Sequence, residues 1–205
     1  MYQTLTEILT GIVDSLALSE DRKETLVPLI TFIQQKVSDG KPVNLNFICT
    51  HNARRSHLAQ IWAQAAAAHF HIPGVYCYSG GTEQTALHTQ VAETLKEQGF
   101  QVIGLTHADS PVYAIKYADA AAPIIGFSKK YDHAFNPVSG FAAIMTCSEA
   151  DGGCPFIAGA EKRIPVPYED PKTADATPQQ AAVYAQRSLE IASEMCYVFS
   201  KIKPE

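Results

Sequence analysis

The strongest constraint on the fold is a short loop between an apolar strand and a helix. Residues 43–48 read Val-Asn-Leu-Asn-Phe-Ile, which is typical of a buried strand. Residues 49–56 follow as Cys-Thr-His-Asn-Ala-Arg-Arg-Ser, and helical spacing continues over 56–71. In such a loop the amides and the helix N-terminus point at one anion-sized space, and that field favours the reactive thiolate of Cys49. The simpler alternative is a buried cysteine at a strand end.

Several side chains of this loop suit the binding of a tetrahedral anion. Arg55 can hold two oxygens at once, and the Ser56 hydroxyl can donate to the cysteine sulfur. Asn52 tolerates the left-handed backbone that such a loop needs. His51 and Arg54 are expected at the rim, and for His51 a plain solvated surface position is an equal alternative. The residues predicted to bind the anion are Thr50, His51, Asn52, Ala53, Arg54, Arg55 and Ser56.

Strands alternate with helices from residue 43 onward. The expected strands are 43–48, 75–79, 101–105, 141–146 and 162–167, and the expected helices are 56–71, 88–99 and 177–201. This order predicts an α/β fold with three layers, in which helices cover both faces of a central, mostly parallel sheet. Ligands of such sheets bind at the carboxyl ends of the strands, where the cysteine loop lies. Residues 112–130 interrupt the pattern and are expected to form an inserted β-hairpin.

The N-terminal part of the chain carries a separate helical pattern. Apolar residues recur at helical spacing over residues 5–16, and Ser19 is a good N-cap for a second helix, which Pro28 is expected to kink or restart. The chain therefore divides into a helical extension, residues 1–40, and an α/β domain, residues 41–205. A helical hairpin there could serve a homodimer or another partner, but we favour two helices that cover their own domain.

Charge and cysteine content exclude several classes of protein. A formal net charge of −5 with no basic run argues against a nucleic-acid partner. No apolar stretch reaches the roughly 18 residues of a membrane span, and the N-terminus has no basic and apolar leader pattern. An odd number of cysteines, 5, then indicates a reducing, cytoplasmic environment, in which cysteines are catalytic, metal-binding or buried rather than permanently paired.

A second group of cysteines follows the fourth expected strand. Residues 147–155 read Cys-Ser-Glu-Ala-Asp-Gly-Gly-Cys-Pro, which places Cys147 on the same sheet edge as Cys49. A straight helix would hold Cys147 and Cys154 about 10 Å apart, too far for a disulfide, but the two glycines ease unwinding. The spacing suits a relay in which Cys147 attacks an adduct on Cys49 and Cys154 then attacks Cys147. The alternatives are a core cysteine and half of a metal site whose other ligands are missing.

Asp170 is the candidate proton donor. It lies in a proline-rich stretch after the last expected strand, and a carboxyl on such a loop could protonate a leaving oxygen as general acid. The alternative is a turn that starts a helix. Cys77 and Cys196 lie in apolar strand and helix patterns, so both are expected in the core.

Together these motifs resemble a known superfamily. The loop motif Cys-x2-Asn-x2-Arg-Ser that begins at Cys49, with Asp-Pro at residues 170–171, resembles the low-molecular-weight protein tyrosine phosphatases. The pattern Cys-x6-Cys-Pro from Cys147 is closer to the thioredoxin-coupled arsenate reductases built on the same fold. The resemblance covers about residues 43–202, and the order of the three cysteines is more specific than the loop alone.

The resemblance implies a role for each of these residues. In that family the cysteine matching Cys49 attacks arsenate, the arginine matching Arg55 holds it, and the aspartate matching Asp170 protonates the departing hydroxyl. The cysteine matching Cys147 then displaces arsenite, and the one matching Cys154 resolves the product into a disulfide that thioredoxin reduces. The resemblance thus implies an arsenate reductase of arsenic detoxification, with thioredoxin as its external reductant.

Some features depart from the family pattern. His51 stands where glycine is usual, so the loop backbone or its rim is expected to differ. Gln60 replaces a residue that is often acidic in the reductases, some of which bind potassium there. Asn52 and Ser79 still match that site, which leaves potassium open, but the missing carboxylate argues against it, so we expect no bound cofactor. The N-terminal helices and the 112–130 insertion have no counterpart in the minimal fold.

Three functions remain open on sequence. The first, which we favour, is arsenate reduction by three thiols. The second is hydrolysis of phosphotyrosine or another phosphomonoester through a phosphocysteine at Cys49, with Cys147 and Cys154 structural or protective against over-oxidation. The absence of a tyrosine-rich segment after Asp170 weakens this second function. The third is a non-catalytic module that binds anions or senses redox state.

Overall fold

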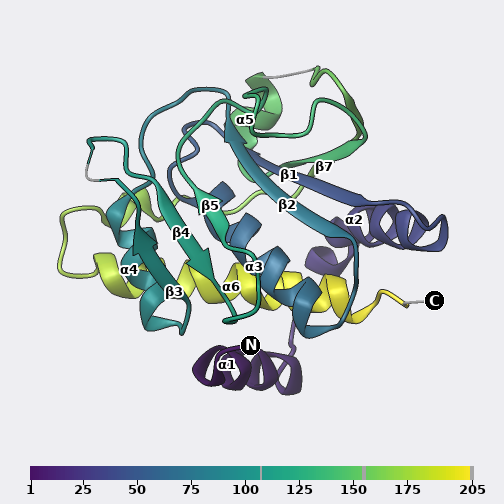
Figure 1. The fold of residues 1–205 in the computed structure, drawn as a ribbon, viewed down its shortest axis with the longest axis horizontal. Helices are drawn as coiled ribbons and strands as arrows, with labels where there is room; N and C mark the ends of the chain where they lie inside the picture. The colour runs from purple at the N-terminus through teal and green to yellow at the C-terminus, as the bar shows by residue number, and fades with distance from the viewer. Residues whose placement is uncertain (107, 154–155, 204–205) are drawn as a thin grey trace.

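A parallel sheet forms the centre of the molecule. The computed structural model describes residues 1–106, 108–153 and 156–203. Strands β1 (Val43–Cys49), β2 (Val75–Gly81), β6 (Phe141–Met145) and β7 (Ala160–Pro165) pair in parallel in the order β2-β1-β6-β7 (Figure 1). The predicted strands at 43, 75, 141 and 162 are therefore confirmed as members of one sheet, and β1 with its cysteine lies inside it.

Helices cover the two faces of this sheet unequally. They are α1 (Gln3–Asp14), α2 (Glu20–Ser38), α3 (Arg55–His69), α4 (Thr89–Glu97), α5 (Ser148–Gly153), α6 (Gln180–Ser200) and the 3-10 helix η1 (Pro171–Ala174). Side chains alternate along a strand, so Leu45 and Phe47 of β1 pack with the large core beside α3 and α6, while Ile48 packs on the opposite face with Ala150 of α5. The predicted three-layer α/β fold is confirmed.

One predicted strand lies outside the parallel sheet. β3 (Gln101–Gly104) pairs antiparallel with β4 (Tyr113–Lys116), and β4 pairs antiparallel with β5 (Ile124–Gly126), which gives a separate three-stranded sheet. The expected hairpin within 112–130 is thus confirmed, whereas the placement of β3 in the parallel sheet is wrong. The physical reason is that β3 is exposed or half-buried along its length, and strands inside a parallel sheet are buried on both faces.

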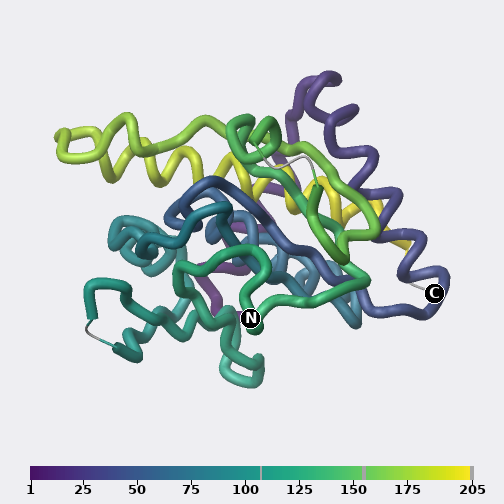
Figure 2. The backbone as a smooth tube through the Cα atoms, turned by 90° about the horizontal axis from the view of Figure 1, so that it is seen from above, coloured from purple at the N-terminus to yellow at the C-terminus, as the bar shows by residue number. Residues whose placement is uncertain are grey.

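The two N-terminal helices pack on their own domain. Leu5 and Leu9 of α1 and Leu26 and Leu29 of α2 are fully buried and belong to the same core cluster as Trp62 of α3. Figure 2 shows α2 crossing the C-terminal half of α6, and α1 contacts α6 and α3. The favoured interpretation is therefore confirmed, and the apolar stripe that suggested a homodimer through residues 1–40 is used inside the molecule.

The expected cap and the expected break in the second helix have different outcomes. The Ser19 hydroxyl accepts a hydrogen bond from the Arg22 amide at 3.3 Å, which confirms the N-cap. α2 continues through Pro28 without restarting, because burial of one helix face outweighs the single lost backbone bond. Among the described residues, no helix combines the length and apolar character needed to cross a membrane.

We predict that the N-terminal helices stabilise the fold through the core that they share with the α/β domain. Leu29→Ala should lower the free energy of unfolding by about 2–5 kcal/mol, because it opens a cavity in the shared core. Val27→Ala is the matched control on the same helix, since Val27 is 52% exposed and its loss should be small. Urea denaturation measures both, and equal effects of the two changes would contradict a shared core.

Candidate active site

The loop after β1 is held from outside through its carbonyl oxygens. Backbone amides of the 82–88 segment donate to three of these carbonyls: Thr82 to Cys49 (3.1 Å), Glu83 to Thr50 (2.8 Å) and His88 to Ala53 (3.1 Å). The His51 carbonyl accepts from two hydroxyls, those of Thr85 (2.9 Å) and Ser128 (3.1 Å). Each peptide whose carbonyl points outward turns its amide toward the other side. The Asn52 amide accordingly donates to the Cys49 sulfur at 3.2 Å. The loop is therefore a cradle of amides around that sulfur.

Asn52 and Ser56 hold the sulfur as the sequence predicted. Asn52 adopts the left-handed backbone with φ 46°, and its side-chain amide donates to Ser56 Oγ at 2.9 Å. Ser56 Oγ lies 3.1 Å from Cys49 Sγ. Because the serine oxygen already accepts from Asn52, its own hydrogen is free to point at the sulfur. Cys49, at 3% exposure, thus has two donors suited to its thiolate.

His51 does not strain the loop although glycine is usual there. Its φ lies outside the left-handed region, so a side chain is tolerated. The imidazole is 41% exposed, with Nε2 3.7 Å from the Glu83 carboxylate. A side chain at this position therefore fits the loop, and the imidazole lies at its rim.

Gly81 explains how the neighbouring segment comes so close to the loop. A Cβ at Gly81 would lie 2.3 Å from the Glu83 carbonyl oxygen and 2.7 Å from that of Thr50. Any side chain would therefore push the 82–83 segment away from the carbonyls that it holds. Gly81 is the last residue of β2, so the close approach begins where the strand ends.

Arg55 is buried and fixed at three points around the cradle. Its Nη2 pairs with Asp170 Oδ2 at 2.7 Å, and its Nη1 donates to the Tyr168 carbonyl at 3.1 Å and lies 3.9 Å from Glu149 Oε2. Asp170 Oδ1 also accepts from the Lys172 amide at 3.0 Å, as the N-cap of η1. Asp170 thus starts a helical turn and also borders the cradle, while its role as proton donor stays a prediction. A small hollow lies among Cys49, His51, Ala53, Arg54, Arg55 and Asp170.

Cys147 lies against the same loop. It is fully buried, and its sulfur is 3.4 Å from the Thr50 hydroxyl and 3.4 Å from the Ala150 amide. It shares an apolar cluster with Cys49 on the α5 face of the sheet. The predicted placement of the two cysteines at one sheet edge is thus confirmed. Cys154 lies outside the described residues.

Behind the loop lies a polar group that the sequence did not reveal. His57 is fully buried, with Nε2 2.9 Å from the Asn52 carbonyl and Nδ1 3.2 Å from Ser79 Oγ. Burial and the positive charge of Lys129 lower the pKa of His57 to about 3, and burial lowers that of Lys129 to about 8. The Lys129 amide donates to Asn52 Oδ1 at 2.9 Å. A neutral His57 therefore braces Asn52 from behind.

This arrangement does not suit a potassium ion. Asn52 Oδ1 and Ser79 Oγ already have protein partners, and only Gln60 Oε1 of the three candidate oxygens is left unpartnered. The buried Lys129 ammonium supplies a positive charge behind the same loop. No cluster of three or more metal-binding side chains occurs in the described ranges.

Arg54 lies at the rim, as expected, but is not solvated. Its guanidinium hydrogen-bonds the Tyr184 hydroxyl and pairs with Asp175, and its side chain is 11% exposed. Tyr184 donates to Asp175 Oδ1 at 2.6 Å, and His88 Nε2 lies 3.7 Å from Asp175 Oδ2. Burial, with the Asp175 hydrogen bond, raises the pKa of Tyr184. α6 therefore fixes one side of the cradle through long-range contacts that the sequence pattern did not indicate.

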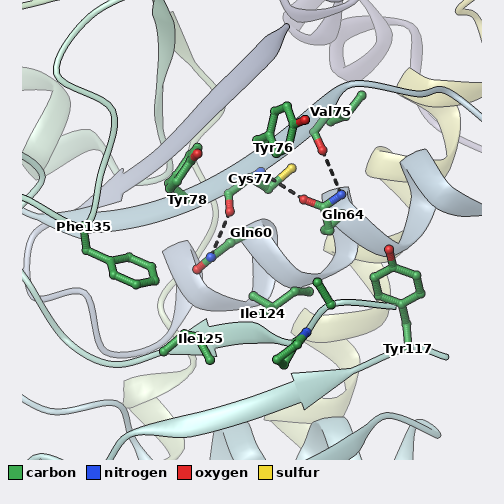
Figure 3. Close-up of a pocket in the computed structure, with 12 residues that line it drawn as sticks. Gln60, Gln64, Val75, Tyr76, Cys77, Tyr78, Tyr117, Ile124, Ile125 and Phe135 are labelled. Atoms are coloured by element: carbon green, nitrogen blue, oxygen red, sulfur yellow. Dashed lines mark hydrogen bonds between the residues drawn. The ribbon is translucent and has the colours of Figure 1, made fainter. Parts of the chain in front are cut away.

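A larger hollow, of about 380 Å³, shares no lining residue with the cradle. Gln60 and Gln64 of α3 border it and bond to the outer edge of β2 (Figure 3). Gln60 donates to the Cys77 carbonyl, while Gln64 donates to the Val75 carbonyl and accepts from the Cys77 amide. The edge of the sheet is thereby closed by side chains of its own chain.

Burial raises the pKa of the Cys77 thiol and raises that of Cys196 to about 12, which agrees with the predicted core positions.

Comparison with known proteins agrees with this fold and loop. Residues 44–122 match the sequence profile of the low molecular weight phosphotyrosine protein phosphatase family. The match covers part of the chain, and the fold of the chain is that of the low-molecular-weight phosphatases. No curated protein matches the sequence significantly. In this chain the cysteine, arginine and aspartate predicted from the sequence, Cys49, Arg55 and Asp170, line one hollow.

Solved structures resemble the chain at low sequence identity, and the two phosphatases with TM-scores of 0.51 and 0.50 share its fold. A low-molecular-weight protein tyrosine phosphatase from T. tengcongensis is 16% identical with a TM-score of 0.51, covering 78% of this chain and 99% of its own. A YwlE arginine phosphatase is 11% identical with a TM-score of 0.50, covering 77% and 94%. A thioredoxin-dependent arsenate reductase from Corynebacterium glutamicum is 16% identical with a TM-score of 0.40, covering 96% and 84%.

We predict that the Ser56 hydroxyl activates the nucleophile. Ser56→Ala should slow alkylation of Cys49 by iodoacetamide at pH 7 about tenfold, because the thiolate loses one hydrogen bond. Mass spectrometry of the Cys49 peptide measures the rate. Ser38→Ala, at the end of α2, is the control and should leave it unchanged. An unchanged rate in Ser56→Ala would show that the hydroxyl does not stabilise the thiolate.

The neutral state of His57 predicts a loss of stability in mild acid. Its folded pKa of about 3 lies below the unfolded value of 6.5, so the unfolded chain binds the extra proton below pH 6.5. Lowering the pH from 7 to 5 should therefore cost about 2 kcal/mol of unfolding free energy through this group. His57→Asn should lack that share of the pH dependence in urea denaturation. The same fall in parent and variant would contradict a buried neutral imidazole.

Proposed function

We propose that this protein is an arsenate reductase that uses Cys49, Cys147 and Cys154 as a thiol relay. The observation that carries the proposal is the position of Cys147, whose sulfur contacts Thr50 of the loop at 3.4 Å in an apolar cluster shared with Cys49. In phosphate-ester hydrolysis a second thiol beside the nucleophile takes part in no chemical step and would be structural or protective. It is required when the oxyanion is to be reduced.

The first step is attack by the Cys49 thiolate on arsenate. The loop amides and Arg55 hold the oxyanion, and one arsenate oxygen leaves as water after it takes a proton from Asp170. The product is a Cys49–arsenic(V) adduct. Asp170 is suited to this step because one oxygen is fixed by the Lys172 amide while the other faces Arg55.

Reduction follows when the Cys147 thiolate attacks the Cys49 sulfur. A Cys49–Cys147 disulfide forms, the arsenic–sulfur bond breaks, and its electron pair stays on arsenic, which leaves as arsenite(III). Cys154 then attacks the Cys147 sulfur and releases the Cys49 thiolate. An external dithiol protein such as thioredoxin reduces the Cys147–Cys154 disulfide, and we place this cycle in the reducing cytoplasm.

The second candidate is a phosphatase, and a specific observation favours it. Cys49, Arg55 and Asp170 border one hollow and form a complete set for hydrolysis of a phosphomonoester through a phosphocysteine. The family matched by residues 44–122 is also named for that activity. Because both reactions share the first step, weak phosphatase activity alone does not contradict the reductase.

Disulfide mapping after a single turnover separates these functions. The reduced protein is incubated with arsenate and no reductant, and disulfides are mapped by mass spectrometry. The reductase should yield one arsenite per chain and a Cys147–Cys154 bond. Robust ester hydrolysis without arsenite would favour the phosphatase, and neither activity would favour the non-catalytic module.

Single substitutions then assign the order of the relay. Cys147→Ser should block release of arsenite and leave the Cys49 adduct, whereas Cys154→Ser should release one arsenite and stop at a Cys49–Cys147 disulfide. Cys77→Ser, in the core and outside the cradle, is the matched control. If Cys147→Ser and Cys154→Ser turn over arsenate like the parent, the relay is wrong.

A further inference from the structure

A buried ion pair joins the N-terminal extension to the last helix. Arg22 of α2 binds Glu194 of α6 through two parallel bonds, Nε to Oε1 at 2.5 Å and Nη2 to Oε2 at 2.8 Å. Glu194 is 1% exposed. Two parallel bonds fix the orientation of the guanidinium. The cost of removing both charges from water offsets much of their attraction, so an apolar pair of the same size would stabilise the fold about as well.

The same arginine packs against a residue of the site. The Arg22 guanidinium carbon lies 5.1 Å from the centre of the Tyr168 ring, which is 4% exposed. The Tyr168 amide donates to the Thr146 carbonyl at 3.1 Å, and its carbonyl accepts from Arg55 Nη1 at 3.1 Å. One tyrosine therefore has its ring against the extension and its carbonyl on the arginine of the cradle.

We propose that Arg22 and Glu194 are positioning residues that aim Arg55 at the oxyanion through Tyr168. Neither touches the anion. They fix the Tyr168 ring, the ring fixes its carbonyl, and the carbonyl holds one arm of the guanidinium so that the fork faces the cradle. The inference rests on the proposed function only in taking the cradle to bind a tetrahedral oxyanion.

The geometry predicts an effect on anion binding and none on the reactivity of Cys49 in the empty site. The two donors to the Cys49 sulfur are the Asn52 amide and the Ser56 hydroxyl, and neither belongs to the Arg55 guanidinium. Loss of the Arg22 contact should therefore weaken anion binding and leave the reactivity of the empty site unchanged. A general loosening of the fold would alter both quantities, so the pair of measurements distinguishes positioning from mere support.

Protection of Cys49 from alkylation measures both quantities without any assumption about turnover. Iodoacetamide modification of the full chain is followed by mass spectrometry against increasing inorganic phosphate. Arg22→Met should raise the phosphate dissociation constant about five- to tenfold, the scale of one impaired charge-assisted contact, with an unchanged rate at zero phosphate. Lys36→Met, which removes a different ion pair of α2, with Glu161, is the matched control and should change neither.

A double-mutant cycle tests the route through Arg55. Arg55→Lys removes the planar fork, so adding Arg22→Met to it should weaken phosphate binding less than about twofold further. A full five- to tenfold additional loss would overturn the proposal, as would unchanged phosphate binding in Arg22→Met alone.

A second variant keeps the test decisive if the unpaired Glu194 prevents folding. Arg22→Met combined with Glu194→Leu leaves no buried charge alone and should show the same loss of phosphate affinity. Parental affinity in this folded double variant would overturn the proposal. If phosphate fails to protect Cys49 in the parent chain, the oxyanion cradle itself is wrong, and that result is separate from any effect of Arg22.

Discussion

The site depends on the hydrogen bonds that pull the carbonyls of residues 49–53 outward. The carbonyls of residues 49, 50, 51 and 53 accept from the 82–88 segment and from Ser128. The amides are thereby turned to the other side of the loop, where that of Asn52 donates to the Cys49 sulfur. Without those donors the peptides could turn over and present oxygen to the anion, which would repel it. Gly81 allows the donor segment to approach, and a neutral His57 braces Asn52 from the other side. The cradle is thus made by tertiary contacts around a short local motif.

Sequence predicted the parts of this site that are local. The roles of Asn52 and Ser56 follow from their spacing to Cys49 within one loop and one helical turn, and the strand order placed Cys147 near them. The Tyr168 carbonyl and the donors at Thr85 could not be predicted. Backbone groups and small hydroxyls carry no distinctive pattern, and their partners lie far away along the chain.

The fold, too, was predictable where strands are buried and not where they are short and exposed. Buried strands such as β1 and β6 have apolar runs long enough to identify, and βαβ order then fixes a parallel sheet. β3 is a short strand with exposed positions, so its sequence fits an antiparallel edge as well as a parallel one, and only the hairpin beside it decides. The N-terminal helices were correctly expected to cover their own domain. Their contact with Tyr168 could not be predicted, because it is made by one arginine, Arg22, whose ion-pair partner Glu194 lies on α6.

The pairing of Arg55 with Asp170 has a consequence for how the cradle fills. One arm of the guanidinium holds the Tyr168 carbonyl and the other holds the carboxylate, so an arriving oxyanion must share or displace Asp170. In the proposed reaction the Asp170 carboxyl lies on the same guanidinium that holds the anion. Anion binding and the position of the proposed proton donor would therefore both depend on how the Arg55 guanidinium is oriented.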